Sequence, residues 1–203
     1  MPRPDDLTRR NRAKLLLIIA LFVLPPASAW IAWKYLGSAG VDATTNAGTL
    51  VQPARPLDVA GLQRVGGGAI GEGDLRGHWT YVMFANGGCD ATCEQQLYLT
   101  RQIRLAMNKD MQRVQRVLVV DAPPQTPLAS QLESAHQDLI VAVRDAGAAP
   151  LLQRFRGNGF STGGAQYFLV DPLGNLMMFY DLEVPAKGML RDLQKLLKIS
   201  QIG

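Results

Sequence analysis

"WTYVMFANGGCDATC" runs from Trp79 to Cys93, and this stretch decides how the chain can fold. Its first seven residues are apolar and rich in aromatic and β-branched types, which is typical of a buried strand. Two glycines follow, and a segment from about Asp90 to Met111 then carries part of an apolar stripe at helical spacing. The stretch therefore predicts a strand, a tight turn and a long helix, with both cysteines of the chain at the junction.

The segments that follow alternate between strand and helix patterns. Further strands are predicted at Val114–Asp121, Leu139–Val143, Gln166–Val170 and Leu176–Asp181, the last two forming a hairpin. Further helices are predicted at Leu128–Gln137, Pro150–Phe155 and Pro185–Ile199. This order predicts an α/β domain with a central mixed sheet flanked by helices. A dithiol directly after the first core strand is the arrangement of the thioredoxin-like fold.

The N-terminal part of the chain has the pattern of a membrane signal. Leu15–Trp33 contains 19 residues without a charge, and as a helix it would span about 28 Å, close to the apolar thickness of a bilayer. Basic residues precede this segment, and none follows between Lys34 and Arg55. The positive-inside rule then predicts a single-pass protein of a bacterial inner membrane, with a cytoplasmic N-terminus and a periplasmic C-terminal domain.

Four segments are predicted along the chain. Residues 1–14 form a basic cytoplasmic N-terminus, 15–36 a transmembrane anchor, 37–56 a flexible linker and 57–203 the thioredoxin-like domain. A cleaved signal peptide is the alternative to the anchor, because Ala27-Ser28-Ala29 resembles a cleavage site. Both interpretations export the domain.

The net charge of +4 belongs to the N-terminal segment. Residues before 37 carry six Lys and Arg against two Asp, whereas the rest of the chain carries 15 basic and 15 acidic residues. The body of the protein therefore has no general nucleic-acid signal.

Cys89 and Cys93 can serve as a disulfide staple, a redox couple or two ligands for a soft metal such as Cu(I). Residues four apart share one helix face, so the two sulfur atoms can meet. The helix N-terminus favours a thiolate at Cys89, whereas the neighbouring carboxylates of Asp90 and Glu94 oppose it. A bridge over so short a loop constrains the unfolded chain little, which argues against a purely structural role.

The chain resembles the Sco/SenC family, which are membrane-anchored thioredoxin-like factors for assembling the copper centre of cytochrome c oxidase. The resemblance covers about Leu57 to Leu197 and rests on "DLRGHWTYVMFANGGCDATC", on the CxxxC spacing and on "YFLVDPLGNLMMFY". It implies that Cys89 and Cys93 act as a redox pair or as copper ligands, with Cys89 as the more exposed sulfur. It also implies a partner in the oxidase subunit that bears the copper site, or in another periplasmic thiol protein.

The chain departs from the family at the third copper ligand. The family uses a histidine shortly before the last hairpin, and the alignment places Gly163 or a neighbour there. Gly163 and Gly164 are expected to line the site as bare backbone. His78 and His136 are expected to lie away from the cysteines, and Met83, Met177 and Met178 are thioethers for which packing is the simpler role.

Three hypotheses follow for the dithiol. The first is oxidase assembly, by Cu(I) delivery or by reduction of the oxidase's copper-site thiols. The second is a general exported thiol–disulfide oxidoreductase. The third is a non-catalytic module that binds a partner, so the sequence leaves open whether the protein is an enzyme.

Overall fold

The computed structural model describes residues 4–40 and 45–200. The chain divides into two units, Met1–Thr45 and Asn46–Gly203. The first three residues of the predicted N-terminal segment, and residues 41–44 of the predicted linker, lie outside the described residues.

The first unit contains helix α1 (Pro4–Gly40). Its stretch Lys14–Ala32 has a mean hydropathy of 2.3, and it is the one helix of the described residues that is long and apolar enough to cross a membrane. Pro25 and Pro26 lie inside α1, and the hydroxyl of Ser28 donates a hydrogen bond of 2.9 Å to the Pro25 carbonyl. The predicted apolar N-terminal helix is therefore confirmed, and by length and composition it suits a membrane anchor.

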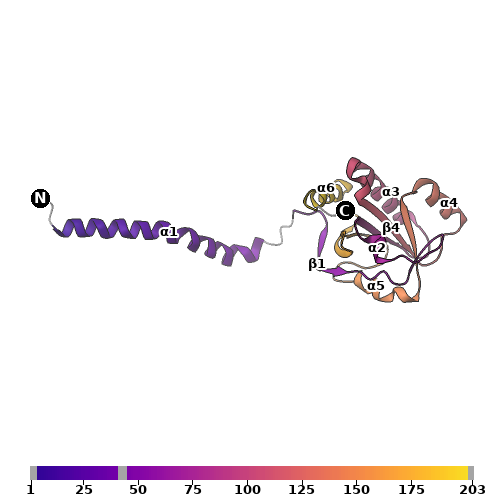
Figure 1. The fold of residues 1–203 in the computed structure, drawn as a ribbon, viewed down its shortest axis with the longest axis horizontal. Coiled ribbons are helices and arrows are strands. Elements are labelled where there is room, and N and C mark those ends of the chain that lie inside the picture. Colours follow the sequence, from indigo (N-terminus) through magenta and orange to yellow (C-terminus); the bar gives the residue numbers. More distant parts are fainter. Residues whose placement is uncertain (1–3, 41–44, 201–203) are drawn as a thin grey trace. The chain divides into compact units, whose positions relative to one another are not determined.

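The second unit is built on one seven-stranded sheet (Figure 1). Its strands are β1 (Thr49–Pro56), β2 (Leu62–Arg64), β3 (Trp79–Ala85), β4 (Val114–Val120), β5 (Leu139–Arg144), β6 (Gln166–Val170) and β7 (Asn175–Asp181). Its α-helices are α2 (Glu72–Leu75), α3 (Ala91–Ala106), α4 (Thr126–Ala135), α5 (Ala149–Arg154) and α6 (Ala186–Ile199). Two 3₁₀ turns, η1 (Asn108–Arg113) and η2 (Ala146–Ala148), complete the unit.

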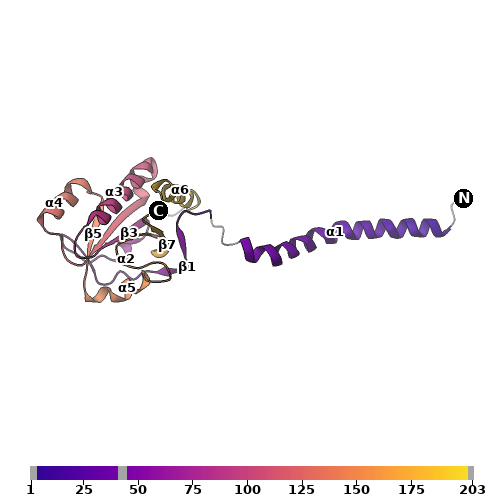
Figure 2. The ribbon, with the colours of Figure 1, turned by 180° about the vertical axis from the view of Figure 1, so that it is seen from behind.

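The strand order is β1-β7-β6-β3-β4-β5-β2. Strands β3, β4 and β5 are parallel, and β6, β7, β1 and β2 pair antiparallel to their neighbours. Helices α3, α4 and α6 cover one face of the sheet, and α2 and α5 lie on the other (Figures 1 and 2). The predicted mixed sheet flanked by helices is confirmed.

Strand β3 lies in the middle of the sheet and is buried along its whole length. Tyr81 and Met83 point into the core layer below α3 and α6, whereas Val82 and Phe84 point into the opposite layer. This alternation explains the continuous apolar run, because a strand covered on both faces needs no polar side. The cysteine-bearing turn therefore starts from one of the most enclosed strands of the unit.

The predicted linker is wrong at both ends. Helix α1 continues to Gly40, and Thr49–Pro56 forms the edge strand β1 on β7. The prolines of this segment are typical of a linker, but an edge strand also tolerates proline. The pairing of β1 with β7 is irregular between Leu50 and Arg55. The compact unit accordingly begins at Asn46 rather than at Leu57.

The chain enters the second unit through a clamp formed by Asp192 of α6. The Asp192 side chain is 1 % exposed, and its Oδ2 accepts hydrogen bonds from the backbone N–H of Ala47 (2.7 Å) and of Gly48 (3.0 Å). Gly48 fits closely, because a Cβ there would lie 2.5 Å from Cε1 of Tyr180. The start of β1 is thus fixed to the core from its first residues.

Candidate functional site

Cys89 and Cys93 lie at the carboxyl end of β3, where the chain turns into α3. Gly87 (φ 76°) and Gly88 (φ 124°) adopt positive φ values that other residues rarely take, and they make this turn possible. The two cysteines are joined by a disulfide, with a Cα–Cα distance of 5.1 Å. The predicted meeting of the two sulfur atoms is therefore present in the structure.

The two sulfur atoms differ in their surroundings. Cys93 is 2 % exposed and belongs to the core layer between the sheet and the helices α3 and α6. Cys89 is partly buried and lies against the same layer from the outside. An incoming thiol can therefore reach the bond through Cys89, whereas Cys93 is shielded.

Asp90 is the N-cap residue of α3, a role that the sequence analysis missed because it treated Asp90 only as a charge. Its Oδ1 accepts a hydrogen bond of 2.9 Å from the backbone N–H of Cys93. The cap satisfies one of the free N–H groups of the first turn and fixes the cysteine loop on the helix. The signal in the sequence is an aspartate directly before a helical pattern.

Asp90→Ala is expected to lower the free energy of unfolding of the oxidised protein by about 1 kcal/mol, because the capping hydrogen bond is lost. Asp90→Asn is the matched control, since asparagine caps a helix about as well as aspartate. Urea denaturation of the full chain in mild detergent gives the difference. Equal losses in both variants would show that charge, and not capping, is the contribution of Asp90.

A hollow of about 520 Å³ opens beside Cys89. It lies between the cysteine turn and the segment that leads from β4 into α4, and it is lined by Gly87, Gly88, Cys89, Asp121, Pro124 and Leu128, among others. We call it the dithiol hollow. Its walls combine apolar side chains with the carboxylate of Asp121.

One wall of the dithiol hollow is fixed by a polar network. Asp121 Oδ2 accepts a hydrogen bond of 3.2 Å from the N–H of Gly87, and Asp121 is ion-paired with Arg144 of β5. Arg144 also donates to Oδ1 of Asn86 at 3.3 Å, and the Asn86 amide donates to the carbonyl of Thr162 at 2.9 Å. The network ties the turn before Cys89 to β4, β5 and the loop that precedes β6. Sequence reasoning missed it because its members come from four separate segments.

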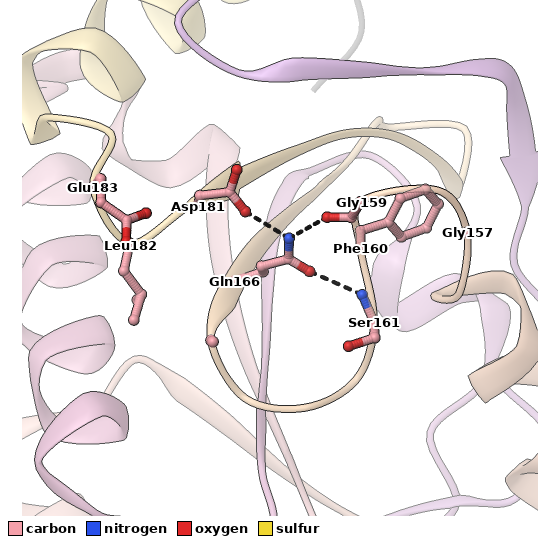
Figure 3. A pocket seen from close by; sticks show the side chains of 9 residues that line it. Gly157, Gly159, Phe160, Ser161, Gln166, Asp181, Leu182 and Glu183 are labelled. Carbon is pink, nitrogen blue, oxygen red and sulfur yellow. Dashed lines mark hydrogen bonds between the residues drawn. The ribbon is translucent and has the colours of Figure 1, made fainter.

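The loop 157–165 lies where the resemblance places the third ligand. Figure 3 shows the buried side chain of Gln166 at the centre of this loop. Its Nε2 donates to the Gly159 carbonyl (2.7 Å) and to Asp181 Oδ1 (2.6 Å), and its Oε1 accepts from the N–H of Ser161 (2.9 Å). Gln166 thus gives the loop a defined shape.

Gly163 and Gly164, the two glycines of this loop that were expected to line the site, have different positions. Gly164 (φ 88°) lies against β3, because a Cβ there would come within 3.1 Å of the Phe84 carbonyl oxygen. Gly163 is exposed and lines a second hollow together with Asn86 and Arg144, rather than the dithiol hollow. The loop therefore touches the cysteine turn through Asn86, but neither glycine lines the hollow beside Cys89.

The histidines lie at the opposite end of the parallel strands from the cysteine turn. His78 directly precedes β3, and His136 precedes β5, so roughly 20 Å of strand separates this end from the cysteine turn. His136 contacts Arg116, with 3.4 Å between Nδ1 and Nη2. Burial, and then the charge of Arg116, lower the pKa of His136 below its ordinary value. Both histidines are therefore remote from Cys89, as expected.

The donor set near the disulfide consists of the two cysteine sulfurs. Within residues 4–40 and 45–200, no group of three or more His, Cys, Asp and Glu side chains could hold a metal ion. The sulfur of Met83 is buried and accepts a hydrogen bond of 3.5 Å from Thr100, and Met178 is also buried. Two thiolates alone suit linear Cu(I) coordination, and only after the disulfide is reduced.

Comparison with known proteins places the second unit in a family. A family described as transmembrane-like, thioredoxin-like, C-terminal domain matches residues 79–200. The chain belongs to this family. The match begins at the first residue of β3 and extends one residue beyond α6, so it includes the cysteine turn of this transmembrane-like, thioredoxin-like protein. Among curated proteins no relative matches it.

Solved structures of Sco proteins share the fold. ScoI of Bradyrhizobium japonicum with copper bound is 20 % identical over 66 % of this chain and 94 % of its own, with a TM-score of 0.52. Apo Sco1 of Thermus thermophilus is 18 % identical over 76 % of this chain and 99 % of its own, with a TM-score of 0.55. BsSco, described as having a disulfide switch and as a member of the Sco family of cytochrome c oxidase assembly proteins, is 14 % identical over 74 % and 99 %, with a TM-score of 0.52. The resemblance to Sco/SenC proteins is thus confirmed in the fold.

Proposed function

We propose that this protein is a membrane-anchored periplasmic factor for cytochrome c oxidase assembly that works by thiol–disulfide exchange at Cys89 and Cys93. The observation that carries the proposal is a disulfide at a helix N-terminus, with one partly accessible and one buried sulfur. The Sco-like fold supports the role in oxidase assembly, and the apolar helix α1 supports the membrane anchor. The target is the oxidase subunit that bears the copper site, whose cysteines must be reduced before they can bind metal.

The exchange conserves atoms and electrons. In the reduced protein, the Cys89 thiolate attacks one sulfur of the partner's disulfide, and the partner's other sulfur leaves as a thiolate and takes up a proton. Cys93, after losing its proton, then attacks Cys89 Sγ and releases the second partner thiol. The partner gains two electrons and two protons, and this protein ends in the disulfide form seen in the structure. A dithiol donor of the same compartment would return it to the reduced form.

The test uses oxidase assembly in a strain that lacks the gene. The wild-type chain is expected to restore the oxidase copper centre, and Cys89→Ser, Cys93→Ser and the double variant are expected to fail. The purified full chain is also expected to exchange with a glutathione or dithiothreitol series at a measurable reduction potential. Full restoration by the double variant would instead support the non-catalytic module, and exchange without any effect on the oxidase would support the general oxidoreductase.

Cu(I) delivery is a second candidate, because Sco structures with copper bound share this fold and two thiolates suit a soft cation. Here Cu(I) would be the cargo, held by Cys89 and Cys93. Anaerobic Cu(I) titration of the reduced full chain, with Cys89→Ser as control, tests this branch. Binding weaker than micromolar in the wild-type protein would remove delivery and leave thiol exchange unaffected.

A further inference from the structure

A second hollow, of about 580 Å³, lies on the other side of the network that holds the cysteine turn. Its lining includes Asn86, Arg144, Arg156, Phe160, Ser161 and Thr162, and we call it the arginine hollow. Asn86 is three residues before Cys89, and Arg144 contacts both Asn86 and the Asp121 wall of the dithiol hollow. The two hollows are therefore neighbours at the carboxyl end of the parallel strands, where the disulfide lies.

The cationic groups of the arginine hollow are positioned by the fold. Arg144 is held by Asp121 and Asn86. Arg55 donates to the carbonyls of Arg154 (3.0 Å) and Arg156 (2.7 Å) and stacks over Phe160, with 5.0 Å to the ring centroid. Its guanidinium lies beside the hollow, since a Cβ on Gly157 would be 3.2 Å from its Nη2. Two of the three guanidinium groups are thus fixed around the loop.

These charges are only partly neutralised. Within residues 45–200, neither Arg55 nor Arg156 forms an ion pair with a carboxylate, and Arg156 is exposed. Residues 154–170 contain no Asp or Glu. Arg144 is paired with Asp121, which lines the dithiol hollow. The adjoining hollow of Figure 3 holds two further carboxylates, Asp181, which is bonded to Gln166, and Glu183. Among residues 45–200, the arginine hollow therefore has two guanidinium groups, those of Arg55 and Arg156, that no carboxylate pairs with.

We infer that the arginine hollow binds a carboxylate of the thiol substrate and so selects anionic partners for the disulfide. Arginine matches a carboxylate in geometry, because its planar guanidinium donates two parallel hydrogen bonds. The carboxylate can belong to a small acidic thiol or to an Asp or Glu close to a cysteine of a partner protein. The inference rests on the proposed thiol exchange and names the class of substrate for that site.

The step that the site would favour is reduction of the disulfide. One substrate thiolate attacks Cys89 Sγ, and Cys93 leaves as a thiolate and takes up a proton. A second substrate thiolate attacks the substrate sulfur of this mixed disulfide and releases Cys89. Two substrate thiols are oxidised to one disulfide, and the protein gains two electrons and two protons as the dithiol.

The test compares three small thiols of different charge on the oxidised full chain in detergent: 3-mercaptopropionate, 2-mercaptoethanol and cysteamine. Each rate is divided by the rate of the same thiol with bis(2-hydroxyethyl) disulfide, which removes intrinsic reactivity. The normalised rate is expected to be about fivefold higher for 3-mercaptopropionate than for 2-mercaptoethanol, as one partly exposed ion pair contributes on the order of 1 kcal/mol. Cysteamine is expected to have the lowest normalised rate. Added salt should reduce the differences between the three normalised rates, because it screens the ion pair.

Arg156→Gln is expected to abolish the preference, and Arg156→Lys to retain part of it. Arg154→Gln is the matched control, because Arg154 is also exposed but does not line the hollow. Equal normalised rates for the three thiols, or an equal effect of Arg154→Gln, would overturn the inference while leaving thiol exchange intact. No reaction with any thiol would refute the proposed exchange itself, and the substrate inference with it.

Two peptides then separate the sources of the carboxylate. One carries a cysteine flanked by aspartates and the other a cysteine flanked by asparagines, and glutathione represents the small acidic thiols. A preference for the aspartate peptide that Arg156→Gln removes would assign the hollow to a partner protein. If Arg156→Gln slows the reaction of glutathione but of neither peptide, the arginine hollow would be assigned to a small acidic thiol.

Discussion

Arg116→Leu is expected to lower the free energy of unfolding by about 3 kcal/mol, because it removes one partner of a buried ion pair. The Arg116 side chain is 0 % exposed. It donates to both carboxylate oxygens of Asp138 (2.9 and 3.1 Å) and to the Leu97 carbonyl in α3 (2.9 Å). Burial lowers the pKa of Arg116, whereas contact with Asp138 opposes that shift.

The variant would leave Asp138 with the longer Arg104 contact (3.5 Å) and would remove one donor from the Leu97 carbonyl. Urea denaturation of the full chain measures the loss. Arg76→Leu is the matched control, since the Arg76–Glu72 pair is exposed (60 % and 58 %) and exposed pairs contribute about 0–1 kcal/mol. The double change Arg116→Leu with Asp138→Leu should recover part of the stability. Similar losses of unfolding free energy for Arg116→Leu and Arg76→Leu would contradict the stabilising role assigned to the buried Arg116–Asp138 pair.

In the reduced protein, Cys89 is expected to react with iodoacetamide roughly tenfold faster than Cys93, or more, because exposure controls thiol reactivity. Cys93 is 2 % exposed, whereas Cys89 lines the dithiol hollow. Mass spectrometry after short labelling gives the two rates within one sample, so each cysteine serves as the control for the other.

The same difference predicts which single variant traps a partner. Cys93→Ser should accumulate a mixed disulfide with an added model disulfide, because Cys89 attacks and nothing resolves the product. Cys89→Ser should trap little, since its remaining thiol is buried. Equal trapping by the two variants, or faster labelling of Cys93, would reverse the assigned order of attack.

The core of the fold could be predicted because its signals are local. The apolar run of β3 and the hairpin turn between β6 and β7 each define an element without knowledge of the rest of the chain. Strands β1 and β2 and helix α2 were missed, because they are short or contain proline or glycine, and they gain their order from pairing with distant segments. Length and composition alone cannot show such pairing.

The candidate site was predictable to a similar depth. The cysteine turn follows directly from strand, glycines and helix, and the remote positions of His78 and His136 follow from the strand order. The contact of Arg144 with Asn86 joins residues that are 58 positions apart in the sequence, and no local sequence pattern predicts it. Long-range side-chain contacts of this kind decide the walls of both hollows.

The clamp at Asp192 has a mechanical consequence. A pull on the N-terminal side of the compact unit is received by Ala47, Gly48 and strand β1, which are fixed to α6 and β7. In the sheet, β7 and β6 stand between β1 and β3. The load path therefore ends in an edge strand and in helix α6, which packs on the same core layer as Cys93, so within the sheet two strands separate β1 from the strand that carries the disulfide turn.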